Sequence, residues 1–205
     1  PATKYVRLEY IPVANQEELT KRVSESSLSN AEFVDAIIFS KNEGVVMVGY
    51  RTDVQEGLTI RRFSRSWDEW FYLHAKKISK HGGGSEVIPI QDYLFRYDRG
   101  AFWMGHHAFK RFHVSNNRLT RFLFNPLLKT RIMYRGLQEA GVGQEYIIQD
   151  VSVPMENVDT LLNYIHASMN IYPVWLLPIT PKAFSNTNIH TNKDFIINVG
   201  IWSSS

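Results

Sequence analysis

Apolar and polar residues alternate clearly near the amino terminus, where Val6, Leu8 and Tyr10 alternate with Arg7 and Glu9. A period of two is typical of a strand that buries one face and exposes the other. We therefore predict a half-exposed strand over residues 5–13.

A helix and two further strands are predicted after this first strand. Asn15 stands three residues before Glu18, close to a capping-box arrangement, and predicts a helix that continues to about Ser27. The strands are predicted at Phe33–Ser40 and Val45–Arg51. The second of these is apolar on both faces, so we expect it to be central in a sheet.

The carboxy-terminal part of the chain, Glu145–Trp202, has the same order of elements. Apolar phrases at Gln149–Met155 and Ile171–Pro178 predict two strands, and the run Phe195–Trp202 predicts a third. Between the first two strands we predict a helix with an apolar stripe, which consists of Val158, Leu161, Leu162, Ile165 and Met169.

The two ends of the chain therefore resemble each other. Tyr5–Pro12 aligns with Tyr146–Pro154, and Val46–Tyr50 aligns with Ile197–Ile201, with few identities. We predict an α+β fold of the ferredoxin-like type, a duplicated β-α-β-β antiparallel sheet with helices on one face and an aromatic helical insertion. The predicted boundaries are 1–52 for the first half-sheet, 53–144 for the insertion and 145–202 for the second half-sheet, all within a single domain of residues 1–205.

The insertion is predicted to be largely helical. A helix from Trp67 or Asp68 to Lys80 ends at the glycines after His81, because glycine tolerates the left-handed backbone beyond a helix. Those glycines lack the flanking strand, helix and Lys-Ser or Lys-Thr pair of a phosphate-binding loop, so we interpret them as an ordinary loop. Further helical segments are predicted at Ile90–Tyr97, Ala101–Phe112, Asn117–Leu123 and Pro126 to about Glu139.

The composition is ordinary for a globular chain, with 44% hydrophobic and 21% charged residues among 205. No apolar run approaches the roughly 20 residues that cross a bilayer. The absence of Cys excludes disulfides and thiol chemistry in this chain. The start, Pro-Ala-Thr-Lys, has neither an initiator Met nor a signal-like apolar core, so we expect a piece of a longer protein.

Positive charge is concentrated in residues 99–138, which contain no Asp or Glu. The basic residues of this stretch are interleaved with aromatic and aliphatic ones. Our first interpretation is that the apolar residues form core and the basic ones a solvated rim, or that the bases neutralise cofactor phosphates. The second is contact with an anionic membrane surface. Nucleic acid is a distant third, and we expect none as a partner.

Several phrases, in order and with similar spacing, resemble the C-terminal half of the delta-24 sterol reductase family of FAD-linked oxidoreductases, which have the vanillyl-alcohol-oxidase fold. The resemblance covers most of the chain. No single phrase decides it. The matching phrases are Lys4–Leu8, Ile88–Tyr93, Arg96–Trp103, Gln149–Met155 and Ile171–Leu176.

This resemblance implies a two-part enzyme, in which an N-terminal domain of the same protein binds FAD and a C-terminal cap domain forms much of the substrate pocket. The chain is expected to be that cap, inactive by itself, with NADPH as a candidate electron donor. The family has His where this chain has Tyr97, so the expected substrate is sterol-like or another lipid. A membrane-associated or cytoplasmic location is also implied.

Candidate catalytic residues follow from the resemblance and from residue chemistry. Tyr97 and Asp150 are candidate proton donors, and Arg99 is a candidate contact to the cofactor. The alternatives are surface ion pairs of Arg96 or Arg99 with Asp98, and an ordinary ion pair for Asp150. The candidate substrate-binding residues are Trp103, Gln149, Tyr172, Trp175 and Asn198.

Three histidines, His106, His107 and His113, lie close together in sequence but have no nearby acidic residue. A divalent metal site usually adds carboxylates or further ligands. We therefore predict no metal site and interpret these residues as surface or pocket histidines.

We predict the cap and substrate domain of an FAD-dependent oxidoreductase that reduces a carbon–carbon double bond. The alternative is a non-catalytic ferredoxin-like module that binds a partner or a membrane surface through the basic aromatic stretch. A FAD-binding domain encoded before Pro1 would favour the enzyme.

Overall fold

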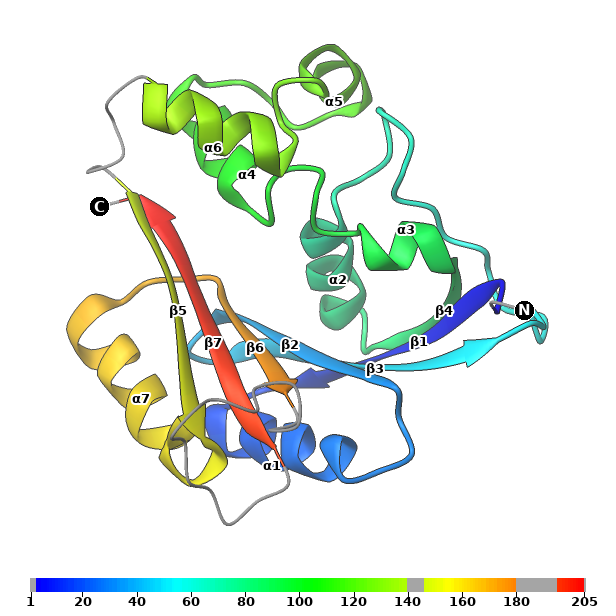
Figure 1. The fold of residues 1–205 in the computed structure, drawn as a ribbon, viewed down its shortest axis with the longest axis vertical. Coiled ribbons are helices and arrows are strands. Elements are labelled where there is room, and N and C mark those ends of the chain that lie inside the picture. Colours follow the sequence, from blue (N-terminus) through cyan, green and yellow to red (C-terminus); the bar gives the residue numbers. More distant parts are fainter. Residues whose placement is uncertain (1–2, 140–145, 180–194, 205) are drawn as a thin grey trace.

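The fold is a twisted antiparallel sheet with helices on both faces, here described from a computed structural model for residues 3–139, 146–179 and 195–204 (Figure 1). Within these residues the sheet has seven strands in the order β4-β1-β3-β2-β6-β7-β5. The strands are β1 (Tyr5–Val13), β2 (Phe33–Ser40), β3 (Glu43–Thr52), β4 (Gly84–Pro89), β5 (Tyr146–Pro154), β6 (Val174–Ile179) and β7 (Ile196–Ser204). The predicted α+β class is confirmed.

The first helix, α1 (Gln16–Ser27), begins where the capping pattern predicts. The Asn15 Oδ1 atom accepts a hydrogen bond of 2.8 Å from the Glu18 amide. The Glu18 carboxylate in turn accepts one of 3.0 Å from the Ala14 amide. These two bonds use amides that the helix itself cannot pair, so the local sequence alone specifies the start of α1.

Both halves of the chain follow the order β-α-β-β. In the second half, β5 is followed by a short 3-10 turn at Met155–Asn157, the helix α7 (Val158–Tyr164) and a π-helical turn at Ile165–Met169. The halves meet where β2 pairs with β6, at Ala36 and Leu176. Strand order is thus 1-3-2 in the first half and its mirror image in the second. A ferredoxin-like duplication stays a prediction, as do the proposed domain boundaries.

Helices cover both faces of the sheet, and the two helices outside the insertion, α1 and α7, lie on one face as predicted. On one face, α1 and α7 pack on Ala36, Ile38 and neighbouring buried residues. On the other, Ile37 and Phe39 pack against the inserted helices. Successive residues of β2 are apolar because successive side chains of a strand point to opposite faces, and here both faces are covered.

The inserted segment contains five helices among the described residues, of which α2, α3 and α4 contact strands of the sheet (Figure 1). Helix α2 begins at Phe71, a few residues later than predicted. The five helices are α2 (Phe71–Lys80), α3 (Ile90–Leu94), α4 (Met104–Arg111), α5 (Arg118–Phe124) and α6 (Thr130–Glu139) among the described residues. No helix in this described part of the chain is both long and apolar enough to span a membrane.

Strand β4 is an element that the sequence did not predict. It pairs with β1 at one edge of the sheet, with Ile88 opposite Val6 and Glu86 opposite Leu8. Its apolar run is short, and the buried Glu86 interrupts the alternation of apolar and polar positions. The carboxylate is accommodated because Tyr10 donates to it at 2.7 Å and His74 lies 2.9 Å from it.

Candidate functional site

Asp150, Gly200 and Trp175 lie in one row across three neighbouring strands. Asp150 pairs with Gly200 between β5 and β7, and Trp175 pairs with Gly200 between β6 and β7. Directly paired residues have their side chains on the same face of a sheet. A Cβ atom on Gly200 would lie 3.1 Å from Asp150 Oδ1 and 3.3 Å from Trp175 Cε3. The missing side chain therefore lets the carboxylate and the indole approach each other.

Asn198 lies on the same face as this row, two residues before Gly200 on β7. It pairs with Ser152 on one side and with Leu177 on the other. Its Oδ1 atom is buried and has no hydrogen-bond partner among the described residues. A buried acceptor without a donor costs free energy, so this position suits a donor supplied by a ligand or by another part of the protein.

Phe102 brings the insertion onto this face. Its ring stacks on Tyr97, with centroids 4.5 Å apart and an angle of 10° between the planes. It also lies 4.4 Å from the Trp202 ring and 5.2 Å from the Trp175 ring. Ala101 and Phe102 both have positive φ angles, 46° and 59°, which side chains other than glycine seldom adopt. The sharp turn at these residues directs the Phe102 ring onto the sheet.

Asp35, in strand β2, connects the aromatic residues to the sheet through hydrogen bonds. Its Oδ2 atom accepts hydrogen bonds from the Tyr97 hydroxyl at 2.6 Å, from Arg96 Nη2 at 3.0 Å and from Trp175 Nε1 at 3.1 Å. Burial raises the pKa of Tyr97 well above its usual value, and the negative charge of Asp35 raises it further. The phenol therefore stays protonated and donates to the carboxylate.

Sequence reasoning missed Asp35, Phe102 and Trp202 as parts of this site. One signal was present for Asp35: it is the only charged residue in the strand Phe33–Ser40. The sequence suggests that Arg96 could pair with Asp98, but in the structure Arg96 pairs with Asp35, 61 residues away. No local pattern predicts a pair at that separation.

Two of the predicted site residues are held inside the insertion. The rings of Phe102, Trp175 and Trp202 together form an aromatic wall. The Trp103 indole is 1% exposed and donates a hydrogen bond of 2.6 Å to the Trp202 carbonyl, so it lies behind this wall. The Arg99 guanidinium donates to the carbonyls of residues 63, 66 and 68 and to Asn125 Oδ1. Burial lowers the pKa of Arg99 to about 10. Its donors are largely used within the chain, and a contact to the cofactor stays a prediction.

Gln149 and Tyr172 lie on the opposite face of the sheet. Gln149 directly precedes Asp150 in β5, so its side chain points away from the row. Tyr172 packs against the core on the side of α1 and α7, and its hydroxyl lies 2.7 Å from His166 Nδ1. The structure thus brings together Tyr97, Asp150, Trp175 and Asn198, but not these two.

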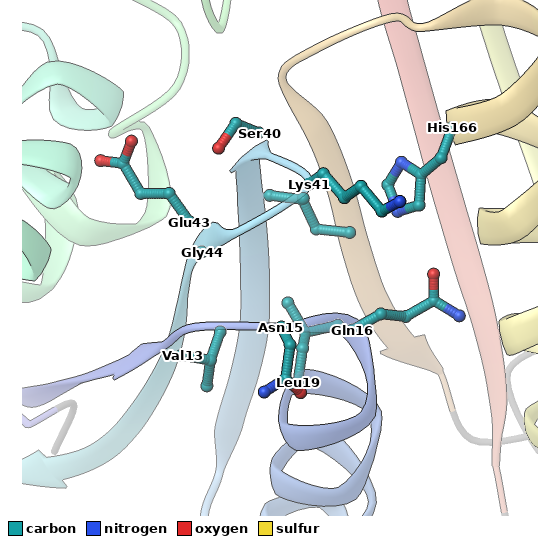
Figure 2. A pocket seen from close by; sticks show the side chains of 10 residues that line it. Val13, Asn15, Gln16, Leu19, Ser40, Lys41, Glu43, Gly44 and His166 are labelled. Atoms are coloured by element: carbon teal, nitrogen blue, oxygen red, sulfur yellow. The ribbon is translucent and has the colours of Figure 1, made fainter.

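A small hollow adjoins His166 on that opposite face (Figure 2). It lies between the start of α1, the turn that joins β2 to β3, and the π-helical turn after α7. A second, open hollow with a volume of about 570 Å³ lies beside it and shares Asn15, Gln16, Lys41 and His166. Burial and the nearby Lys41 both lower the pKa of His166. Acidic Glu17 and Asp159 line the open hollow together with Lys41, so its charge is mixed.

The three clustered histidines do not converge on a metal. His106 and His107 lie in α4, with ring centroids 6.4 Å apart, and burial lowers the pKa of both. Among the residues that the structure describes, no three potential ligands from His, Cys, Asp or Glu form a metal-binding group.

Curated relatives of this chain were found by sequence comparison. The Delta(24)-sterol reductase of Homo sapiens is 29% identical over 185 residues, which are 87% of this chain and 35% of the relative. The homologue from Caenorhabditis elegans is 28% identical over 194 residues, covering 89% of this chain and 36% of the relative. The chain is homologous to the Delta(24)-sterol reductases.

The homology to Delta(24)-sterol reductases extends to plants. The Arabidopsis thaliana enzyme is 28% identical over 192 residues and 85% of the chain. The chain spans about a third of the length of these relatives, 34% in this case. No family profile matches the chain. Because the relatives are reductases by name, the family to which the chain is related is one of oxidoreductases.

Proposed function

We propose that this chain is the cap and substrate domain of an FAD-dependent oxidoreductase. The proposed reaction is reduction of a carbon–carbon double bond in a sterol-like or other lipid substrate. The observation that carries the proposal is the row Asp150–Gly200–Trp175, which joins a carboxyl group to an aromatic wall on one sheet face. The activity for which the relatives are named, Delta(24)-sterol reductase, agrees with a substrate that is mostly apolar.

The flavin ring is proposed to lie over the same face. Over Gly200 the Asp150 carboxyl group and the Trp175 indole approach each other, so a planar ring or an apolar substrate on this face would contact both groups. The unpaired Asn198 Oδ1 atom is an acceptor for an N–H or O–H group brought to that face. When bound, a reduced flavin supplies hydride chemistry, with NADPH as the candidate source of its electrons. We assign the binding of FAD mainly to a separate domain of the same protein.

Asp150 is the better candidate to deliver a proton to the substrate. Its carboxyl group is exposed on the face where the substrate would lie. The Tyr97 hydroxyl, in contrast, donates to Asp35, and the raised pKa of Tyr97 makes the phenol a weak acid. Tyr97 then holds Phe102 and Trp175 in place, and those rings form the wall beside the substrate.

The remaining predicted residues take lesser roles in this scheme. Trp175 and Asn198 would contact the substrate, and Trp103 would support the wall from behind. Contacts of Gln149 and Tyr172 with the substrate, and of Arg99 with the cofactor, remain predictions. A lipid-like substrate also agrees with peripheral contact between the protein and a membrane.

Two substitutions test the assignment in the protein that includes the flavin-binding domain. We expect Asp150→Asn to lower turnover by about 100-fold or more, because general-acid catalysis typically contributes that much. Tyr97→Phe should lower it by about tenfold through positioning. NADPH-dependent reduction of the flavin should be unchanged in both. Ser152→Ala, an exposed change on the same strand and face, is the control.

Unchanged turnover in Asp150→Asn would contradict its role as the proton donor. Measurable turnover that falls in Asp150→Asn would favour the enzyme over the non-catalytic module. A protein without a flavin-binding domain, encoded from a natural start near Pro1, would contradict the enzymatic proposal. The isolated chain, with FAD added, should show no turnover.

A further inference from the structure

Helix α5 (Arg118–Phe124) has its charged and apolar sides reversed relative to a helix on a water-exposed surface. Arg121 is 9% exposed and points into the protein, where it donates to the Trp67 carbonyl and to Asn116 Oδ1. Leu119, Phe122 and Leu123 are 65%, 52% and 59% exposed. Helices that face water normally bury such residues and expose the arginine.

These side chains form one surface with the loop before α2. The Trp67 ring is 38% exposed and lies beside Phe122, with centroids 6.5 Å apart. We call Trp67, Leu119, Phe122 and Leu123 the α5 patch. Helix α5 lies at the periphery of the molecule, away from the sheet (Figure 1). The patch therefore protrudes and is separate from the sheet face that carries Asp150.

The charge around the α5 patch is mostly positive, although Asp68 and Glu69 directly follow Trp67. Residues 99–138 contain no Asp or Glu. Arg118 within α5, Lys110 at the end of α4, and Lys129 and Arg131 around the start of α6 are all exposed. A second copy of the chain would bring the same positive charge to this patch, so self-association through it is disfavoured by repulsion.

We propose that the α5 patch docks on an anionic phospholipid surface. Its Leu, Phe and Trp side chains enter the boundary between headgroups and acyl chains, and the surrounding Lys and Arg side chains contact the phosphates. Tryptophan beside leucine and phenylalanine suits this boundary, because its ring is apolar and its N–H is polar. This inference uses neither the catalytic residues nor the flavin.

Vesicle flotation of the 205-residue chain tests the docking. We expect binding to vesicles of phosphatidylcholine with about 30% phosphatidylserine, and weaker binding to phosphatidylcholine alone. Raising the salt from about 0.05 M to 0.5 M should weaken binding, because the Debye length shortens. The combined variant Leu119→Ser, Phe122→Ser and Leu123→Ser should lower the partition coefficient by about tenfold or more.

A matched control is available on other surfaces of the molecule. Leu28 and Val54 are 58% and 56% exposed, comparable to the α5 patch. The variant Leu28→Ser with Val54→Ser should bind vesicles as the unmodified chain does. Circular dichroism should show both variants folded. Loss of binding in this control, or its retention in the α5 variant, would overturn the proposal.

The absence of Cys allows a second test that leaves the other side chains unchanged. A polarity-sensitive fluorophore on Leu123→Cys should shift to shorter wavelength when anionic vesicles are added. The same label on Leu28→Cys should not shift. If the Leu123→Cys label is already shielded in the protein that includes the flavin-binding domain, and does not respond to vesicles, a protein domain covers the patch and the lipid proposal is wrong. The vesicle-binding result does not depend on the proposed catalytic role of Asp150, so unchanged turnover in Asp150→Asn would not contradict the lipid proposal.

Discussion

The Tyr97 hydroxyl donates a hydrogen bond of 2.6 Å to Asp35, a residue 62 positions earlier in the chain. This bond links the insertion to the central strand β2. The Asp35 carboxylate also accepts from Arg96 and Trp175, so three elements of the fold meet at one buried group. The position of the aromatic wall beside Asp150 and Gly200 therefore depends on a single carboxylate.

Asp35→Asn should strongly destabilise the fold. The change keeps the shape of the side chain but leaves the guanidinium of Arg96, whose side chain is 10% exposed, without its counter-charge. Breaking a buried ion pair typically costs about 3–5 kcal/mol. Urea denaturation would measure the loss. The same chemical change at the exposed Asp150 should alter the unfolding free energy by less than about 0.5 kcal/mol. Similar values for the two variants would contradict a structural role for Asp35.

Arg99→Lys should loosen the loop at residues 63–68. A lysine cannot reproduce the fork of bonds that Arg99 makes to three backbone carbonyls and Asn125. We expect a loss of about 2–4 kcal/mol in unfolding free energy, from several hydrogen bonds to a charged group. Limited proteolysis should cut the loop faster. Arg131→Lys, at an exposed position, is the control, and equal cleavage rates would count against this role.

The elements with regular patterns were predictable from the sequence. Helix α1 has its own capping residues, and β2 and β3 are apolar for long enough to be recognised as strands. Strand β4 was not predictable, because its buried Glu86 is compatible with a strand only when Tyr10 and His74 supply hydrogen bonds. Those partners come from two distant elements.

The candidate site was predictable only in part. Tyr97, Asp150, Trp175 and Asn198 were identified from phrases shared with a family, and strand pairing places the last three on one face. The face to which each residue of β5 points depends on the pairing register of the strand. This register places Asp150 on one face and Gln149 on the other. Register depends on the whole sheet, so no short phrase could have excluded Gln149 from the row.

The network around His74 should make stability depend on pH. Burial alone would lower the pKa of His74, but hydrogen bonds to Glu69 and Glu86 and the charge of Glu86 raise it overall above the ordinary 6.5. Arg61, which also lies beside Glu86, acts in the opposite direction. A raised folded pKa means that protonation stabilises the fold. This contribution is complete below about pH 6.5 and is lost as the pH rises through the folded pKa.

Comparison of unfolding free energies between the unmodified chain and His74→Gln isolates this contribution. The unfolding free energy of the unmodified chain as a function of pH also includes contributions from His106 and His107, whose lowered pKa values act in the opposite direction. The difference between the two proteins should be largest on the acidic side of neutrality and should shrink as the pH rises. A difference that grows with pH would contradict the assigned protonation.

Gly200→Val should separate stability from catalysis. The added side chain approaches the exposed Asp150 carboxylate, which can move aside, and the edge of the Trp175 ring. Valine is favoured in strands and glycine is not, so we expect the unfolding free energy to change by less than about 1 kcal/mol. The valine side chain, however, pushes apart the Asp150 carboxyl group and the Trp175 indole, which the substrate and flavin would contact. In the protein with its flavin-binding domain, kcat/KM should fall by about tenfold or more, as expected for displaced reactants. Val151→Thr, on the opposite face of β5, should leave kcat/KM unchanged. Full activity in Gly200→Val would place the reaction elsewhere than on this face.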